Sequence, residues 1–254
     1  MLHTLLVLAI APAIFFLWFF YSRDKYEKEP LRMVLLTFLL GMFSIIPAII
    51  LEEIGFYLIP ESDYVFVILI HSFMTIGLSE ELCKFSAMIP SFRSIEFNEV
   101  MDGIVYGASA ALGFATIENI FYVLDGGVTT GILRAIFSIP SHALNGVVMG
   151  YFIGLAKFNE AKRLKLIVTG LGLSAILHGL WDFFSMTGLM LGILILYIIG
   201  WSLFFRYRKL ALKKSLFRKR NCTKCGATLN KEYKYCIKCD ELMNPNYKVS
   251  TNII

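Results

Sequence analysis

Apolar residues fill most of this chain in long uninterrupted stretches, without the short alternation typical of a soluble domain. Stretches of the length needed to cross a bilayer, roughly 17 to 25 residues, lie near residues 1–21, 33–59, 64–90, 100–124, 131–156, 164–185 and 187–206. The pattern predicts an all-α, polytopic transmembrane bundle of about seven helices. No Lys or Arg precedes the first apolar run, which predicts a retained helix and not a removed signal peptide.

The polar pattern changes toward the carboxyl end and predicts three parts. Residues 1–206 form the transmembrane domain, residues 207–220 a basic connector, and residues 221–254 a small polar module. The composition agrees with a membrane body, because 57% of the residues are hydrophobic and 17% are charged. The mean hydropathy is +0.68, which excludes an ordinary soluble protein.

Basic residues are strongly biased to one side of the predicted helices. With the amino terminus outside, seventeen Lys and Arg residues fall on the cytoplasmic side and only Arg134 falls outside. This agrees with the positive-inside rule and places the carboxyl terminus in the cytoplasm. The net charge of +5 is then explained by topology, and no nucleic-acid partner is expected.

Several ionisable residues interrupt the apolar segments, where each costs roughly 2.5 to 3.5 kcal/mol to insert. Glu80 and Lys84 are four residues apart and can pair on one helix face, whereas Glu81 points about 100° away from Glu80. A structural ion pair would therefore leave one carboxylate free. Such a carboxylate suits proton transfer from water to a leaving group.

Three other segments add further polar groups. His178 and Asp182 are also four apart, so the carboxylate can orient the imidazole. Glu118 and Asn119 lie in another segment, and His142 shares a predicted helix face with Gly146, Gly150 and Gly154, where small residues allow close helix packing.

These groups suit two kinds of function. One is hydrolysis inside the membrane, with a glutamate as general base and His178 or Asn119 stabilising the oxyanion. The other is proton or ion transport, or a membrane scaffold, with the acids as relay stations or structural pairs. The residue types alone leave both open.

The order of these residues resembles the PrsW family of intramembrane proteases, distant relatives of the CAAX-processing and bacteriocin-processing proteases. The matching strings are Glu80-Glu81-Leu82-Cys83-Lys84, Phe114-Ala115-Thr116-Ile117-Glu118-Asn119, Ser141-His142, and His178-Gly179-Leu180-Trp181-Asp182. Asp102-Gly103-Ile104-Val105-Tyr106-Gly107 also resembles the family's stretch before the second string. The resemblance covers about residues 22 to 206.

The resemblance implies an intramembrane endopeptidase that cleaves a membrane-anchored substrate of the anti-sigma-factor kind in a prokaryotic plasma membrane. The implied active-site residues are Glu80, Glu81, Glu118, His142, His178 and Asp182. Glu81 or Glu80 is expected to be the general base, His142 and Glu118 partners of water or metal, His178 the oxyanion donor and Asp182 its orienting group. Glu118, His142 and His178 would suit an active-site zinc ion, but catalysis without metal is equally open.

Four cysteines in the carboxyl-terminal module form two CxxC pairs, Cys222 with Cys225 and Cys236 with Cys239. This spacing predicts a zinc ribbon with four thiolate ligands, because a cytoplasmic location disfavours two disulfides. Gly226 allows the tight turn after the first pair. With no base or nucleophile beside the ligands, the zinc is expected to be structural, and the module a regulatory or recruiting one that could bind a protein partner.

Overall fold

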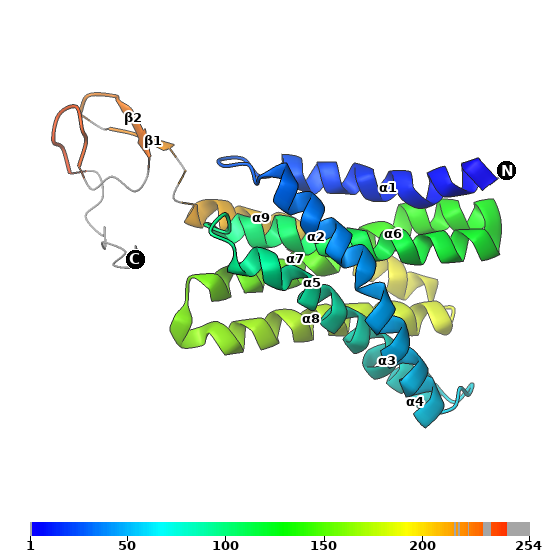
Figure 1. Ribbon diagram of the computed structural model, residues 1–254. Helices are drawn as coiled ribbons and strands as arrows, with labels where there is room; N and C mark the ends of the chain where they lie inside the picture. Colours follow the sequence, from blue (N-terminus) through cyan, green and yellow to red (C-terminus); the bar gives the residue numbers. More distant parts are fainter. Residues whose placement is uncertain (1, 216, 218, 223, 231–234, 243–254) are drawn as a thin grey trace.

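The protein is a bundle of long helices followed by a small module at one end (Figure 1). The computed structural model describes residues 2–215, 217, 219–222, 224–230 and 235–242. Its helices are α1 (Leu2–Ser22), α2 (Leu31–Phe43), α3 (Ile45–Leu58), α4 (Val65–Ile70), the π-helix η1 (His71–Leu78), α5 (Ser79–Arg93), α6 (Val100–Leu133), the π-helix η2 (Arg134–Ser138), α7 (Ile139–Lys157), the short 3-10 helix η3 (Glu160–Lys162), α8 (Arg163–Met186) and α9 (Met190–Lys214). The predicted helical fold is confirmed.

Within the described residues, six helical runs are long and apolar enough to cross a membrane. Their outward faces carry exposed aliphatic side chains, including Leu39, Ile50, Leu194 and Ile198. Such a surface is stable only against lipid or another apolar partner. The helices satisfy their own backbone hydrogen bonds, as a segment inside a bilayer must.

One of these runs, Val100–Lys157, is 58 residues long and folds back on itself. Gly127 has φ 72° and ψ −161°, a backbone conformation that breaks the helix and that glycine adopts readily. The two arms of the run contain the predicted segments 100–124 and 131–156. The described residues thus contain six membrane-length runs where about seven segments were predicted. The difference arises because the predicted segments 100–124 and 131–156 belong to one continuous run that reverses at Gly127.

Glycines hold the two arms of this hairpin in backbone contact. A Cβ placed on Gly103 would lie 2.2 Å from the carbonyl oxygen of Gly150, and one placed on Gly107 would lie 2.2 Å from that of Gly146. Any larger residue would force the helices apart. The close packing predicted for the glycine face of residues 146–154 is therefore confirmed, with α6 as its partner.

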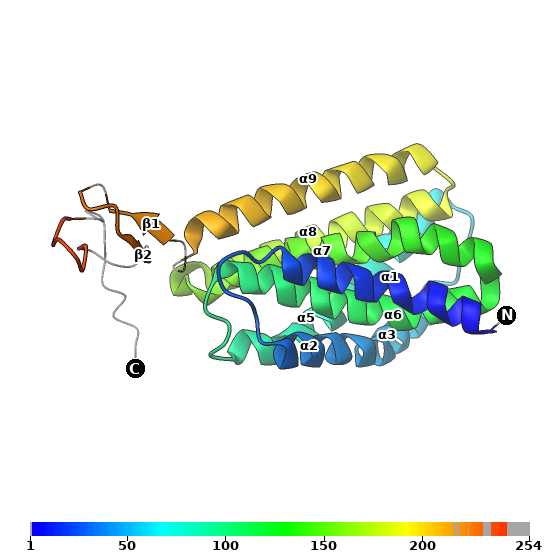
Figure 2. The ribbon, with the colours of Figure 1, turned by 90° about the horizontal axis from the view of Figure 1, so that it is seen from above.

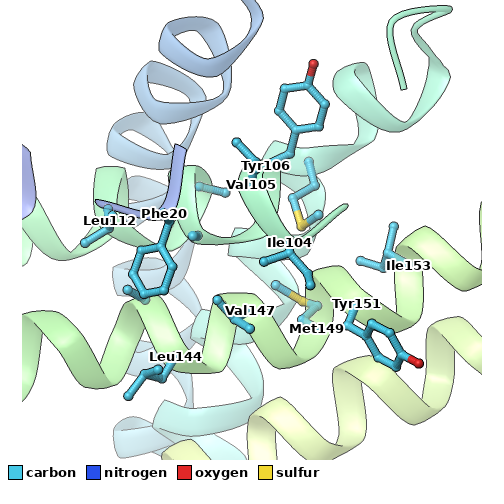
Figure 3. Close-up of a cluster of buried hydrophobic side chains, with 14 of the residues drawn as sticks. Phe20, Ile104, Val105, Tyr106, Leu112, Leu144, Val147, Met149, Tyr151 and Ile153 are labelled. Atoms are coloured by element: carbon cyan, nitrogen blue, oxygen red, sulfur yellow. The ribbon is translucent and has the colours of Figure 1, made fainter. Parts of the chain in front are cut away.

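The α6–α7 hairpin occupies the middle of the bundle. Figure 2 shows α9 along one edge and α2 with α3 along the opposite edge. Figure 3 shows the apolar core around the hairpin, in which Phe20 of α1 lies near Ile104 of α6 and Leu144 and Val147 of α7. The side chains of this core fix the position of α6 and α7, which also carry Glu118 and His142.

The carboxyl-terminal module contains a two-stranded antiparallel sheet, β1 (Lys219–Asn221) with β2 (Thr228–Asn230), in which Arg220 pairs with Leu229. Helix α9 continues to Lys214, so the first part of the predicted connector 207–220 is helical. Residues 231–234 and 243–254 of the predicted module lie outside the described residues.

Candidate active site

The six residues predicted for the active site come together inside the bundle, although they lie on four helices. Glu80 and Glu81 belong to the first turn of α5, Glu118 to α6, His142 to α7, and His178 and Asp182 to α8. Helix α5 continues directly from the π-helix η1, and π-helical turns inside helices are frequent at functional sites. The cluster is therefore built mainly by packing between helices. Only the contacts of Lys84 with Glu80 and Glu81, and that of His178 with Asp182, are made within one helix.

Lys84 lies at the centre of this cluster and is completely buried. Its Nζ is 2.8 Å from Oε2 of Glu80, 2.9 Å from Oε1 of Glu81 and 3.1 Å from Nδ1 of His142. The ammonium group also lies 4.3 Å from the centre of the Phe114 ring. The predicted Glu80–Lys84 pair is present. Lys84 also binds Glu81, so the expectation that one of the two carboxylates is left without a cation is wrong.

Glu81 is enclosed by hydrogen-bond partners and has no exposed surface. Nδ1 of His178 lies 2.8 Å from its Oε1, and the hydroxyl of Ser174 donates to its Oε2 at 2.5 Å. These contacts hold Glu81 fixed and set the orientation of the His178 ring. Ser174 was not predicted, and a lone serine in an apolar helix gives no signal in the sequence.

The other ring nitrogen of His178 faces two carboxylates. Nε2 lies 3.5 Å from Oε2 of Glu80 and 3.3 Å from Oδ2 of Asp182. Asp182 thus contacts the imidazole four residues before it, as the spacing predicted. Because Glu81 holds Nδ1, the Nε2 edge is the one available for a water molecule or a ligand.

Glu118 forms a second centre with His142 and Arg134. Its Oε2 lies 2.9 Å from Nε2 of His142 and 3.0 Å from Nη2 of Arg134. Arg134 comes from η2 and also donates from Nε to Oδ1 of Asn119 at 2.7 Å. The sequence analysis placed this arginine on the outer side, near the start of the fifth predicted segment, and did not include it in the site. In the structure it is a second cation of the cluster beside Lys84.

Asn119 is not placed to stabilise an oxyanion. Its amide nitrogen donates to the carbonyl oxygen of Ala9 in α1 at 3.0 Å, and its amide oxygen accepts from Arg134. The side chain has no exposed surface. These contacts and the burial of the side chain do not support the expectation that Asn119 serves as an alternative oxyanion donor.

Two cavities share Glu118 and Asp182 as lining residues. The first, of about 450 Å³, is also lined by His142, His178 and Arg134. The second, of about 430 Å³, is also lined by Glu80 and Glu52. Glu52 was not predicted as part of the site, although a carboxylate within the apolar stretch 33–59 was a signal for it. Glu81 lines neither cavity.

Comparison with known proteins identifies the family. A family model described as PrsW family intramembrane metalloprotease matches residues 29–207, which include all six predicted residues. The chain is 38% identical over 186 residues to Protease PrsW of Halalkalibacterium halodurans, covering 71% of this chain and 83% of that protein. It is 40% identical over 176 residues to Protease PrsW of Bacillus subtilis, covering 68% and 79%. The chain belongs to the PrsW family.

Membership of the PrsW family makes this chain an intramembrane peptide hydrolase and a multi-pass membrane protein. Protease PrsW of Clostridioides difficile is similarly related, at 36% identity over 72% of this chain and 79% of that protein. No solved structure matches the chain significantly. The relatives support hydrolysis over the alternative of a non-proteolytic scaffold or transporter.

The PrsW family is described as a family of metalloproteases, and the site contains residues that fit a metal ion. Glu80, His142 and His178 are all buried, and each offers one ligand atom within 4.8 Å of the others. Two histidines and one carboxylate are a ligand set used by catalytic zinc sites. This trio has Glu80 in place of the Glu118 of the predicted set.

The four cysteines of the carboxyl-terminal module also lie together. Sγ of Cys222 is 3.5 Å from Sγ of Cys239, and Sγ of Cys225 is 3.5 Å from Sγ of Cys236. All four sulfur atoms lie within 4.8 Å of one another and can hold a metal ion. Gly226 has φ 70°, the left-handed conformation expected for the turn after the first CxxC pair.

Proposed function

We propose that Glu80 is the general base with which this PrsW-family protease hydrolyses a peptide bond. The observation that carries this proposal is the different surroundings of the two neighbouring carboxylates. Glu80 lines a cavity, whereas Glu81 is enclosed by Lys84, His178 and Ser174. A general base must reach the proton that it removes within hydrogen-bond distance or through one water.

A water molecule between Glu80, Asp182 and Nε2 of His178 would be the nucleophile. Glu80 takes a proton from this water as its oxygen attacks the scissile carbonyl carbon, and returns the proton to the leaving amine nitrogen. His178 in its protonated form donates from Nε2 to the oxyanion. Its contacts with Glu81 and Asp182 hold the ring in the required orientation.

Glu80, His142 and His178 are the residues that would hold an active-site metal ion. In the metal-bound enzyme Glu80 and His178 would be ligands, in place of the roles of base and oxyanion donor given above. When bound there, the ion would supply Lewis-acid activation of the water and of the substrate carbonyl. Glu81 and Ser174 then act on His178 as positioning residues, because a ring that binds metal through one nitrogen usually donates from the other to a carboxylate. Zinc is the proposed metal.

We propose a membrane-anchored protein of the anti-sigma-factor kind as the substrate, following the family resemblance. The cavity that contains Arg134, His142 and His178 is also lined by apolar side chains of η2 and α9, among them Phe137 and Ile193. An apolar wall beside a polar centre suits the end of a transmembrane helix that unwinds for cleavage. The proposed orientation places the carboxyl-terminal module in the cytoplasm of a prokaryotic cell.

The proposed base is tested with purified protein reconstituted together with a single-span substrate, and new termini are identified by mass spectrometry. Glu80→Gln is expected to lower the rate about 10² to 10⁴-fold, the usual contribution of a general base. Glu81→Gln is expected to lower it about 10 to 100-fold, as the loss of an orienting partner does. Asp125→Asn changes an exposed acid and is the matched control. A fully active Glu80→Gln would overturn the proposal.

We propose further that the cysteine module is a structural zinc ribbon. A zinc ion with four Zn–S bonds of about 2.3 Å requires sulfur atoms about 3.8 Å apart, close to the 3.5 Å of the two closest pairs. One zinc ion per chain, released by a thiol reagent and absent from Cys236→Ser, would support this assignment. A chain without metal that keeps the module folded would contradict it.

A further inference from the structure

Three buried carboxylates lie together at the end of the bundle opposite to the amino terminus of α1. Asp24 and Glu29 are in the linker between α1 and α2, with Glu29 just before Pro30, the N-cap of α2, and Asp102 is in the first turn of α6 (Figure 1). Their exposed fractions are 1%, 3% and 0%. One oxygen of each lies within 4.8 Å of the other two.

The hydrogen bonds of this group leave Asp24 without a partner. Oδ2 of Asp102 accepts from the backbone N–H groups of Asn98 and Glu99 at 2.7 Å each, and the carboxyl group of Asp102 also contacts that of Glu29. The hydroxyl of Tyr106 donates to Glu29. Both oxygens of Asp24 lack a hydrogen-bond partner, although the side chain is 99% buried. Buried polar groups normally have partners, so this exception needs an explanation.

Nearby cations do not neutralise these acids. Among the residues whose side chains the structure describes, which do not include Lys219 and Arg220, no ion pair joins a Lys, Arg or His to Asp24, Glu29 or Asp102. Lys28 donates to the carbonyl oxygen of Tyr21, and Lys157 donates to two carbonyl oxygens at the end of α5. Burial, helped by the charges of Glu99 and Glu29, raises the pKa of Asp24 to about 7.

The arrangement contrasts with the active site, where Lys84 and Arg134 supply the positive charge. Two ligands on opposite sides of an ion lie about 4.0 to 5.2 Å apart when the metal–oxygen bonds are 2.0 to 2.6 Å. The three carboxylate oxygens lie within 4.8 Å of one another, so they are close enough to bind one such ion together. Three carboxylate oxygens suit a hard cation better than zinc, which prefers nitrogen and sulfur.

We propose that Asp24, Glu29 and Asp102 bind a hard divalent cation, Mg²⁺ or Ca²⁺, which ties the α1–α2 linker to the start of α6. The site is separate from the proposed catalytic centre, because Glu118 lies sixteen residues further along α6, roughly 24 Å at the helical rise. Tyr106 holds Glu29 in place as a positioning residue. The ion would fix the end of the central hairpin on which the catalytic residues depend.

The test uses the full-length protein in detergent, freed of metal with a chelator and then titrated with Mg²⁺ or Ca²⁺. Saturating cation is expected to raise Tm by about 5 °C or more. Asp24→Asn should abolish this shift without lowering Tm in the metal-free protein, since it removes an uncompensated charge and breaks no hydrogen bond. Asp63→Asn, an exposed acid of another loop, is the control and should keep the full shift. The cation with the larger shift at equal concentration identifies the preferred ion.

Tb³⁺ provides a second readout, because a lanthanide bound to these oxygens would be sensitised by the ring of Tyr106. Luminescence is expected in the wild type and in Glu80→Gln, and it should be lost in Asp24→Asn. Loss in Glu80→Gln with retention in Asp24→Asn would place the ion in the catalytic centre and overturn the proposal. The absence of any Tm shift with millimolar Mg²⁺ or Ca²⁺, or an equal shift in Asp24→Asn, would also overturn it and leave protonation as the explanation of the cluster.

Discussion

The guanidinium group of Arg134 lies 3.0 Å from the carboxylate of Glu118, although the sequence predicted Arg134 to lie near the outer start of the fifth segment. The side chains of the pair are 15% and 17% exposed. Arg134 also contacts Asn119 and lies 3.9 Å above the centre of the Tyr122 ring. This arginine therefore joins the returning arm of the hairpin to the arm that carries Glu118.

Replacement of Arg134 should destabilise the hairpin and impair catalysis together. Arg134→Gln removes the ion pair with Glu118 and the charge-assisted hydrogen bond to Asn119. A hydrogen bond from a charged group typically contributes about 1.5 to 3 kcal/mol. We expect a lower Tm and a reduced cleavage rate. In a double-mutant cycle, Arg134→Gln should cost less stability when Glu118→Gln is already present. Strict additivity of the two changes would show that the ion pair contributes nothing.

Ser174 should affect activity through the orientation of Glu81 and His178. Ser174→Ala removes the donor to Glu81 and is expected to lower the cleavage rate about 10 to 100-fold, as the loss of an outer orienting partner does. Ser86→Ala is a matched control, because Ser86 is exposed and its hydroxyl bonds only to the carbonyl of Leu82 on its own helix. Equal activity of the two variants would contradict a positioning role for Ser174.

The glycine contact between α6 and α7 should tolerate no side chain. A Cβ at residue 150 would lie 1.9 Å from the carbonyl oxygen of Gly103, so Gly150→Ala is expected to destabilise the protein by about 3 kcal/mol. Gly172 of α8 has no atom within 4 Å of an added Cβ. Gly172→Ala should therefore be neutral or stabilising by up to about 1 kcal/mol. Thermal unfolding of both variants in detergent tests this pair, and a similar Tm for both would show that the helices can separate at no cost.

Removal of residues 221–254 should leave peptide-bond hydrolysis intact, because the family match ends at residue 207. We expect the truncated protein to insert and to cleave a reconstituted substrate, with altered substrate choice or regulation. Cys236→Ser in the full chain is the matched change, since it removes one proposed ligand without shortening the protein. Complete loss of cleavage in a properly inserted truncation would assign the module a direct part in catalysis.

Sequence reasoning was most successful where chemistry follows from spacing along one helix. The pairs Glu80–Lys84 and His178–Asp182 were predicted from an interval of four residues, and both are in contact. Contacts between helices were not readable in the same way. Ser174 donates a hydrogen bond to Glu81, which is 93 residues away in the sequence. No periodicity along α8 indicates this contact.

The charge pattern gave a partly misleading picture of Arg134. A lone arginine near the outer start of a predicted helix is typical of a residue that faces the aqueous side, and Arg134 was therefore not predicted to belong to the site. The helical run continues through η2, however, which turns Arg134 back toward Asn119 and Glu118. The location of the reversal at Gly127 depends on backbone packing of the glycines of both arms, which composition alone does not specify.

The glycine contact between α6 and α7 also determines which parts of the protein can move. In the run Val100–Lys157, which forms the hairpin, 94% of an apolar stretch of 18 residues is buried. In α9 the corresponding share is 11%. Separation of the hairpin would break backbone contacts and displace Glu118 and His142, whereas a shift of α9 would disturb few buried side chains. We therefore expect a substrate to reach the cavity sideways from the lipid, by displacement of α9, while the catalytic helices stay still.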